Sequence, residues 1–201
     1  MLIYECEQYS PEWWSARLGV PTASCFDKIV TTKGEPSKQA KNYLYQLAGE
    51  RIAGAKVETY TNAAMQRGME LEAEARALFE IVKEVEVKKV GLVYFDDQKK
   101  FACSPDGLLQ DSDLEIKCPL IHTHVSYLLG GTLPSDYFQQ VQGSMLVMGF
   151  SLGWFLSYFP GLPPFIIEVH RDDKFCAALK VALDDFCEEL DQVEAKLRGM
   201  A

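Results

Sequence analysis

The chain has 201 residues, 48% of them hydrophobic, and a formal net charge of −9 at pH 7. This length and composition favour one globular domain over residues 1–201, although two small domains are also compatible. The acidic balance argues against a simple nucleic-acid binder with a basic surface. The net negative charge does not exclude an enzyme that binds phosphate through a local strip of basic residues.

Membrane and secreted classes are also disfavoured. The stretch 137–167 carries no charge, but its apolar part, 145–159, is shorter than a spanning helix needs and contains Gly149 and Gly153. The N-terminal MLIYECEQYS carries acids rather than a basic region followed by an apolar one, unlike a signal peptide. We therefore expect a cytoplasmic protein that does not contact a membrane.

The six cysteines form no recognisable metal-binding or disulfide pattern. No two of them make a C-x-x-C pair, and the chain has only 3 histidines. The spacing therefore disfavours a zinc or iron–sulfur site. Without a secretion signal, a disulfide framework is not expected either. We interpret the cysteines as small buried hydrophobic residues.

Helical patterns dominate the first part of the chain, about 1–84. Ser10 followed by Pro11 predicts the start of a first helix, and Thr22 or Ser24 can cap a second. A polar loop, TTKGEPS, follows. The expected helices of this part are PEWWSARLG (11–19), ASCFDKIV (23–30), about 37–53 and about 62–83.

Strand patterns dominate the second part, about 85–170. β-branched and aromatic runs with partial alternation predict three strands, antiparallel in chain order, and then two apolar strands. Helices are expected between these two groups and at the end of the chain. The expected strands are VEVKKVGLVYF (85–95), KFACSPDGLL (100–109), DLEIKCP (113–119), about 153–159 and about 165–170. The expected helices are about 120–130, 134–148 and 172–198.

This order of elements predicts an α/β fold with a central mixed β-sheet flanked by helices. The apolar strands GWFLSYF and PFIIEVH are expected to be central and covered on both faces, because their apolar character is continuous. The helical N-terminal part, the sheet core and the C-terminal helix would form a single domain.

The segment SPDGLLQDSDLEIKCP (104–119) carries the main chemical pattern. Side chains alternate along LEIKC, so Glu115 and Lys117 share one face and apolar residues occupy the other. An antiparallel hairpin can bring Asp106 beside Glu115. Two converging carboxylates repel unless a cation lies between them, and such oxygen ligands suit Mg²⁺ or Mn²⁺. Lys117 could then orient or deprotonate a water, or stabilise charge on a phosphate.

A surface hairpin with an ion pair is the alternative interpretation, in which Lys117 pairs with Asp106 or another acid. Two observations favour the metal site. Asp106 lies between proline and glycine at a strand end, which indicates a tight turn. Glu115 and Lys117 have apolar neighbours, so their charges would be costly to bury without a function.

Four blocks, in order over about two thirds of the chain, resemble the phage lambda exonuclease family of YqaJ-type alkaline exonucleases. This family belongs to the PD-(D/E)xK nuclease superfamily. The pattern PD-x8-E-x-K in this chain resembles the signature of that superfamily. The blocks are RLGVPTAS (17–24), RGMELEAEARALF (67–79), SPDGLL…LEIKCP (104–119) and YFQQVQGSMLVMG (137–149).

The resemblance implies a restriction-endonuclease-like core and a metal-dependent 5′→3′ exonuclease. Such an enzyme degrades one strand of linear duplex DNA from its end. It releases mononucleotides and leaves a 3′ single-stranded overhang for recombination. The implied cofactor is Mg²⁺, with Mn²⁺ as a substitute and two ions bound. The implied partners are double-stranded DNA ends, a single-strand annealing protein and two further copies in a homotrimeric ring.

The resemblance also implies roles for particular residues. The implied catalytic residues are Lys117, Glu115, Asp106, Glu72 and Gln140. The implied metal ligands are Asp106, Glu115, Glu72 and the carbonyl oxygen of Ile116. The implied pocket for a 5′ phosphate consists of Arg17, Ser24 and Ser104.

The chain departs from the family pattern just after Cys-Pro. The lambda member has an arginine at the position where this chain has Thr123, flanked by His122 and His124. Either histidine could replace that phosphate contact, or Arg17 could suffice. The family's duplex-splitting apolar wedge would fall near Gln39, which is polar, and a basic DNA-binding loop residue would fall near Lys33.

Several of these residues also have simpler interpretations. Glu72 could pair with Arg76 on a solvated helix face, and Ser24 could serve as a helix cap. Trp13 and Trp14 are expected in the core rather than as platforms for stacking bases. A restriction-like or repair endonuclease on the same core, or a non-catalytic DNA-binding module, are the alternative functions.

Overall fold

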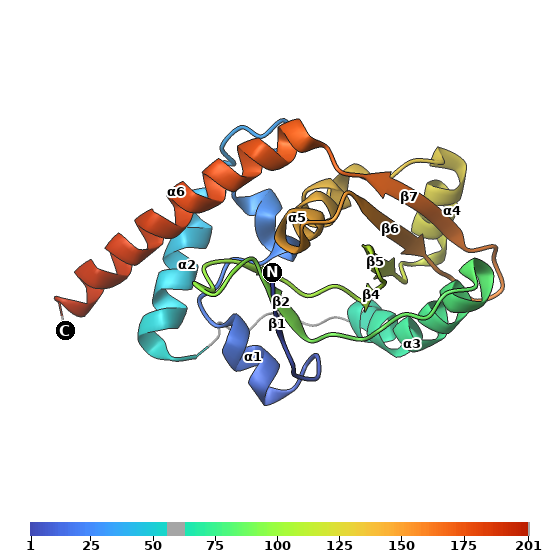
Figure 1. The fold of residues 1–201 in the computed structure, drawn as a ribbon, viewed down its shortest axis with the longest axis horizontal. Coiled ribbons are helices and arrows are strands. Elements are labelled where there is room, and N and C mark those ends of the chain that lie inside the picture. Colours follow the sequence, from blue (N-terminus) through green and yellow to red (C-terminus); the bar gives the residue numbers. More distant parts are fainter. Residues whose placement is uncertain (56–62, 201) are drawn as a thin grey trace.

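In a computed structural model, the chain folds as two small sheets surrounded by helices, and residues 1–55 and 63–200 are described (Figure 1). Among these residues, one sheet has the order β1-β2-β3 and the other β4-β5-β6-β7. The pair β5–β6 is parallel and the pairs β4–β5 and β6–β7 are antiparallel, which confirms the expected mixed sheet. The strands are β1 (Leu2–Tyr4), β2 (Leu92–Tyr94), β3 (Ala102–Cys103), β4 (Gly107–Leu108), β5 (Ser112–Lys117), β6 (Leu152–Ser157) and β7 (Phe165–His170).

The helices follow the predicted order with small differences at their ends. They are α1 (Pro11–Arg17), the 3-10 helix η1 (Ala23–Lys28), α2 (Ala40–Ala53), α3 (Ala63–Lys83), α4 (Ile121–Gly130), the 3-10 helix η2 (Ser135–Tyr137), α5 (Phe138–Met148) and α6 (Asp173–Arg198). Ser10 caps α1 as expected, because its side chain accepts the Trp13 amide at 3.2 Å. The predicted start of α3 at Asn62 lies outside the described residues.

The second predicted helix is a 3-10 helix, and its cap differs from the expectation. Thr22 occupies the N-cap position, but its side chain makes no capping hydrogen bond. Ser24 lies inside η1 rather than at its cap. The hydroxyls of Thr22 and Ser24 instead lie 3.3 Å apart, within hydrogen-bonding distance of each other.

The predicted strand over 100–109 is wrong as a single element. It divides into β3 and β4, which belong to different sheets, with Ser104, Pro105 and Asp106 between them. Pro105 has no amide hydrogen to give to a ladder, so pairing is interrupted there. The three predicted strands therefore do not form one antiparallel ribbon, and the interruption places a turn with Asp106 just before the four-stranded sheet.

The two apolar strands differ in position, and only β6 is central. β6 lies between β5 and β7, whereas β7 is an edge strand of the described sheet. Phe155 of β6 packs with Met145 of α5 on one face, and Leu156 packs with Phe79 of α3 on the other. Glu168 of β7 is exposed, so the expectation that PFIIEVH is central is wrong.

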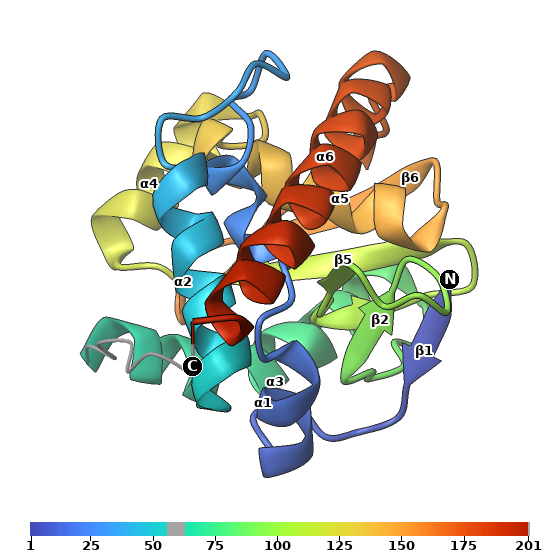
Figure 2. The same cartoon turned by 90° about the vertical axis from the view of Figure 1, so that its left-hand side faces the viewer.

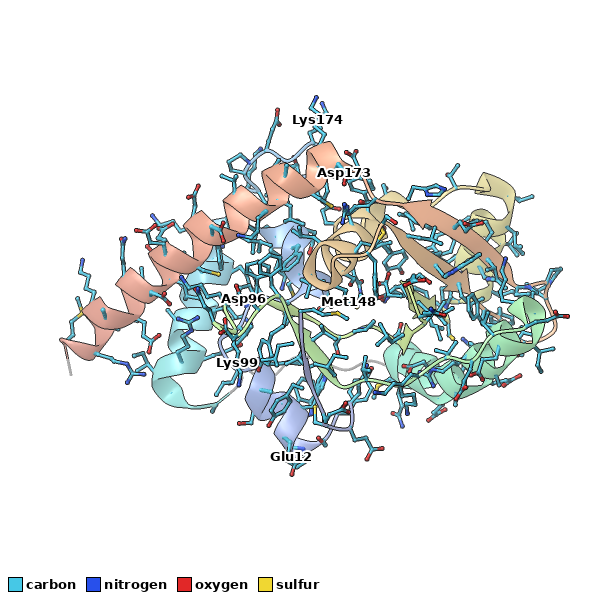
Figure 3. All side chains as sticks on the ribbon, in the orientation of Figure 1. Glu12, Asp96, Lys99, Met148, Asp173 and Lys174 are labelled. Atoms are coloured by element: carbon cyan, nitrogen blue, oxygen red, sulfur yellow. The ribbon has the colours of Figure 1, made fainter. Side chains whose placement is uncertain are left out.

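Helices connect the parallel strands and cover the rest of the core. Because β5 and β6 are parallel, the chain must cross from one end of the sheet to the other, and α4, η2 and α5 make this crossover. Figure 2 shows the long α6 lying across α2. Leu183 and Phe186 of α6 pack with Tyr43 and Leu47 of α2. Figure 3 shows the polar side chains of Asp173 and Lys174 at the N-terminal end of α6. In the described part of the chain, no helix is long and apolar enough to cross a membrane.

Candidate active site

A turn and a strand bring Asp106 beside β5. β4 pairs with β5 so that Gly107 lies opposite Leu114. The Asp106 carboxylate, just before β4, accepts the Ile116 amide at 2.7 Å. Gly107 is required by this close packing, since a Cβ there would lie 2.2 Å from a methyl carbon of Val87. The predicted approach of Asp106 to the Glu115 strand is therefore present.

Alternation along β5 places the two charged side chains on one face. Leu114 and Ile116 are buried in the core on the opposite face. Glu115 is only 3% exposed, and its carboxylate is bonded by both the Lys117 ammonium and the Gln140 amide, the latter at 2.5 Å. Gln140 reaches the site from α5, as the resemblance implied, so three of the candidate catalytic side chains are in direct contact.

Negative charge accumulates at this point of the molecule. Burial, followed by the charge of Glu115 and more weakly that of Glu72, raises the pKa of Asp106 well above its ordinary value. Burial alone would favour the neutral amine of Lys117. The carboxylates of Glu115 and Asp106 outweigh that effect and raise the pKa of Lys117. A cation brought near these acids would be stabilised.

Glu72 borders the site but has a partner of its own. It forms an ion pair with Arg76 one turn later on α3, as the simpler interpretation predicted. Arg76 also donates from Nε to the Asp106 carbonyl at 2.9 Å, so α3 is attached to the Asp106 turn. Glu74, two residues along, instead accepts from the Tyr158 hydroxyl. Of these two acids, Glu72 is the one whose charge acts on Asp106.

The donor set fits a hard divalent cation with water ligands. Within residues 1–55 and 63–200, no three side chains of His, Cys, Asp or Glu converge closely enough to hold a metal by themselves. The carboxylates of Asp106 and Glu115, with the main chain of Ile116 beside them, offer oxygen atoms only. Mg²⁺ commonly uses one or two carboxylates and keeps several waters, so these residues suit it.

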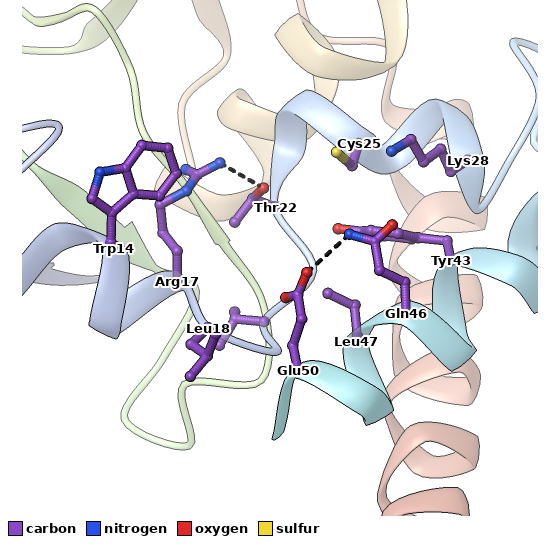
Figure 4. Close-up of a pocket in the computed structure, with 11 residues that line it drawn as sticks. Trp14, Arg17, Leu18, Thr22, Cys25, Lys28, Tyr43, Gln46, Leu47 and Glu50 are labelled. Atoms are coloured by element: carbon purple, nitrogen blue, oxygen red, sulfur yellow. Dashed lines mark hydrogen bonds between the residues drawn. The ribbon is translucent and has the colours of Figure 1, made fainter. Parts of the chain in front are cut away.

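A second cluster lies at the end of α1, and Figure 4 shows two of its members, Arg17 and Thr22, with the hydrogen bond between them. Arg17 donates to the Thr22 hydroxyl at 3.0 Å and lies 3.5 Å from that of Ser24. Its guanidinium carbon lies 4.3 Å from the centre of the Trp13 ring. Burial lowers the pKa of Arg17, and no acidic side chain among the described residues forms an ion pair with it. The structure thus brings Arg17 and Ser24 together, as expected.

Ser104 lies at the indole N–H of Trp13. Its hydroxyl accepts the Trp13 indole N–H at 2.9 Å and donates to the Gly91 carbonyl at 2.5 Å. An isolated bridge between Thr22 and Ala102 keeps the Arg17 cluster next to the start of the Ser104–Asp106 turn. Ser104 therefore links the two clusters through Trp13 and has no direct contact with Arg17.

The remaining predicted DNA-binding residues lie outside both clusters. Lys33 is exposed in the loop before α2, His122 is exposed in the first turn of α4, and Thr123 is half-buried beside it. His124 is fully buried and binds Ser157 and the main chain of residue 163 through its ring nitrogens. His124 therefore holds the fold together and is not available as a phosphate contact.

Sequence reasoning missed several residues around the site. Arg67 of α3 donates to the Pro119 carbonyl at 3.3 Å and stacks on Phe159 at 4.6 Å. The ring of Tyr137 lies 5.1 Å from the Lys117 ammonium. Trp14, expected in the core, is 36% exposed. Only the RGMELE block hinted at Arg67, because one basic residue on a helix is not distinctive.

Comparison with known proteins identifies the family. Residues 12–151 match the YqaJ-like viral recombinase domain, so the chain belongs to this family. The matched range contains both clusters. A comparison with curated protein sequences finds no match.

Solved structures agree with this assignment. The alkaline exonuclease LHK-Exo from Laribacter hongkongensis is 34% identical, with a TM-score of 0.86 over 95% of this chain and 97% of that one. LHK-Exo in complex with dAMP is 33% identical, with a TM-score of 0.85 over the same shares of the two chains. A phage-related exonuclease from Haemophilus somnus 129PT is 16% identical, with a TM-score of 0.72 over 89% and 96%, and it shares the fold. The fold is thus that of an alkaline exonuclease.

Proposed function

We propose that this protein is a metal-dependent exonuclease that degrades one strand of linear duplex DNA in the 5′→3′ direction. It would release mononucleotides and leave a 3′ single-stranded overhang for annealing-type recombination. The family and the likeness to LHK-Exo support a nuclease that acts on DNA. The observation that carries the proposal is the ion pair of Glu115 with Lys117 on β5, where the Asp106 carboxylate binds the Ile116 amide between them, next to the Arg17 cluster.

The acids would hold Mg²⁺, with Mn²⁺ as a substitute. The proposed ligands are Asp106, Glu115, Glu72 and the Ile116 carbonyl, and we propose two ions. When bound, the metal supplies Lewis acidity and an activated water. Lys117 contributes a positive charge next to the scissile phosphate. Gln140 holds the Glu115 carboxylate in one orientation.

The bonds made and broken follow from the proposed products. The oxygen of a water molecule forms a bond to phosphorus, and the P–O3′ bond of the terminal nucleotide breaks. The leaving oxygen takes up a proton and becomes the 3′-hydroxyl of the released mononucleotide. The shortened strand then carries a new 5′ phosphate. Each round therefore regenerates the group that the Arg17 cluster would bind.

The Arg17 cluster would bind the 5′ phosphate. A half-buried guanidinium without a carboxylate partner suits a phosphate, which accepts two parallel hydrogen bonds from its fork. Ser24 lies within reach of the same anion, and Ser104 would support the cluster through Trp13. Contacts to phosphate rather than to base edges imply little sequence preference.

Residues at the rim would contact phosphates further along the strand. Lys33, His122 and Thr123 remain candidates, and Arg67 is a new one because its guanidinium lies beside Pro119, just after β5. The homotrimeric ring, the annealing partner and the cytoplasmic location are further proposals that rest on the family resemblance.

The decisive experiment compares linear 5′-phosphorylated duplex DNA with covalently closed circular DNA, each with Mg²⁺ or EDTA. We expect degradation of the linear substrate alone, in the 5′→3′ direction, and only with Mg²⁺. Cleavage of the circle would favour the restriction-like or repair endonuclease. Binding of linear DNA without hydrolysis, under any divalent metal, would instead favour the non-catalytic module.

A further inference from the structure

The most unusual backbone near the site belongs to Tyr9, between β1 and α1. Its φ is 67°, in the left-handed region that side-chain-bearing residues rarely adopt. Its ring lies 5.2 Å from that of Trp13 and 6.4 Å from that of Trp14. Tyr9 is nevertheless 44% exposed. A strained tyrosine that keeps an exposed ring face indicates a constraint other than core packing.

The neighbouring residue fixes Tyr9 next to the acidic site. The Gln8 side-chain amide donates to the Pro105 carbonyl at 2.8 Å and to the Val90 carbonyl at 3.0 Å. Pro105 directly precedes Asp106. The Tyr9 backbone is therefore held between α1 and the Asp106 turn.

Both charged clusters act on the Tyr9 hydroxyl. Burial, then the charges of Glu72 and Asp106, raise the pKa of Tyr9 to about 12, while Lys117 and Arg17 oppose this rise. Tyr9 and Glu72 line the same surface hollow. No hydrogen bond joins the Tyr9 hydroxyl to another residue in the described part of the chain. The side chain thus packs on Trp13, borders the hollow that Glu72 also lines, and remains partly exposed.

We propose that Tyr9 is a nucleotide-positioning residue whose ring, supported from behind by Trp13, stacks on the base of the 5′-terminal nucleotide. The inference rests on the proposed function. When mononucleotides are released, one nucleotide joins the 5′ phosphate at Arg17 to the phosphate at Asp106 and Glu115. Its base must therefore lie between the two clusters. Tyr9 is an aromatic side chain beside both, because it packs on Trp13 of one cluster and lines a hollow with Glu72 of the other. Aromatic stacking tolerates every base, since each has a π-face.

The kinetic test uses Tyr9→Gly, because glycine adopts a φ of 67° without strain and the fold should be kept. The substrates are 5′-phosphorylated linear duplexes with a normal or an abasic first nucleotide. We expect KM for the normal end to rise on the order of tenfold, with no change for the abasic end. Tyr9→Phe, which keeps the ring, should keep the preference for a base.

A matched control is Tyr45→Ala, which removes an exposed ring from α2. It should leave KM for both ends unchanged. If Tyr9→Gly leaves KM unchanged for both the normal and the abasic end, or raises KM equally for both, the stacking role is wrong. If the wild-type protein does not shorten linear DNA at all, the proposed function fails, and this inference fails with it.

A binding test does not depend on turnover. In the Lys117→Ala background, we use a duplex with the fluorescent base 2-aminopurine at its 5′ end. The fluorescence of that base should be quenched when the protein binds. Adding Tyr9→Gly should remove most of that quenching and leave the binding of internal duplex unchanged. Equal quenching with and without Tyr9 would overturn the proposal even if the enzyme is an active exonuclease.

Discussion

The two clusters of the site are held by different kinds of structure and carry opposite charge. The acidic cluster is positioned by the pairing of β4 with β5, and Gln140 of α5 binds Glu115 there. The cationic cluster is formed by the end of α1, the start of η1 and the Trp13 ring. In neither cluster is the charge fully neutralised by neighbouring side chains, so the acidic cluster favours a metal ion and the cationic cluster favours an anion. The end of a DNA strand, with a metal ion at its scissile phosphate and a 5′ phosphate at Arg17, would satisfy both at once.

The largest expected effect concerns the acidic cluster. Lys117→Ala removes the positive charge beside the phosphate, and we expect kcat on linear DNA with Mg²⁺ to fall by about 10²–10³-fold. DNA binding should be retained. Lys174→Ala, at the exposed start of α6, is the control and should keep the native rate. Native turnover in Lys117→Ala would remove the mechanism.

The cationic cluster predicts an effect restricted to one kind of DNA end. Arg17→Ala should lower kcat/KM for 5′-phosphorylated duplex by roughly 10–100-fold, because it loses charge-assisted hydrogen bonds. Rates on 5′-hydroxyl duplex should hardly change. Arg198→Ala, on the exposed end of α6, provides a comparison with an unrelated arginine. Equal losses on both ends would mean that Arg17 supports the fold rather than the phosphate.

A smaller effect is expected from the contact that links α5 to β5. Gln140→Ala leaves the Glu115 carboxylate with one donor fewer, and losing an outer contact of a metal ligand typically costs about 10-fold or more. The measurement is activity against Mg²⁺ concentration, which should show a raised metal requirement. Gln192→Ala, exposed on α6, tests the loss of a glutamine far from both clusters. An unchanged metal requirement would separate Gln140 from the metal site.

The smallest expected effect is on the stability of the metal-free protein. Because the pKa of Asp106 is raised in the folded state, the unfolded chain releases this proton at lower pH. Wild-type stability in EDTA should then fall as pH rises above the ordinary value of about 3.9. Asp106→Asn removes that loss of stability. A gain of about 1 kcal/mol in the free energy of unfolding would raise Tm by roughly 2–4 °C at neutral pH.

The same substitution should abolish metal-dependent hydrolysis, which separates stability from activity. Asp111→Asn, on the exposed turn before β5, is the control and should leave Tm unchanged. A lower Tm for Asp106→Asn in EDTA would show that the charge-assisted hydrogen bond donated by the Ile116 amide to the carboxylate outweighs the repulsion.

Local pattern was sufficient for much of this site. Period-two alternation assigned Glu115 and Lys117 to one face, and that placement holds because the apolar residues between them need the core. The edge position of β7 could not be read locally, since strand order depends on the crossover through α4 and α5. The ion pair of Glu72 with Arg76 followed from helical spacing, but the reach of Arg76 to the Asp106 carbonyl did not.

Residues that act through long-range contacts were the ones missed. Tyr9 and Gln8 belong to a short N-terminal segment with weak periodicity, and β1 went unrecognised because it has only three residues. Arg67 carries no signature that sets it apart from other surface arginines. The role of His124 depends on Ser157 of β6, which no spacing rule connects to it.

The Gln8 amide gives the start of the chain a part in the chemistry. It binds the carbonyl of Pro105, 97 residues away in sequence and adjacent to Asp106. The first eight residues contain none of the proposed ligands, yet they help to set where a ligand stands. A peptide fused to the N-terminus, or a truncation there, would therefore act as an active-site change, and a tag at the far end of α6 would disturb the enzyme less.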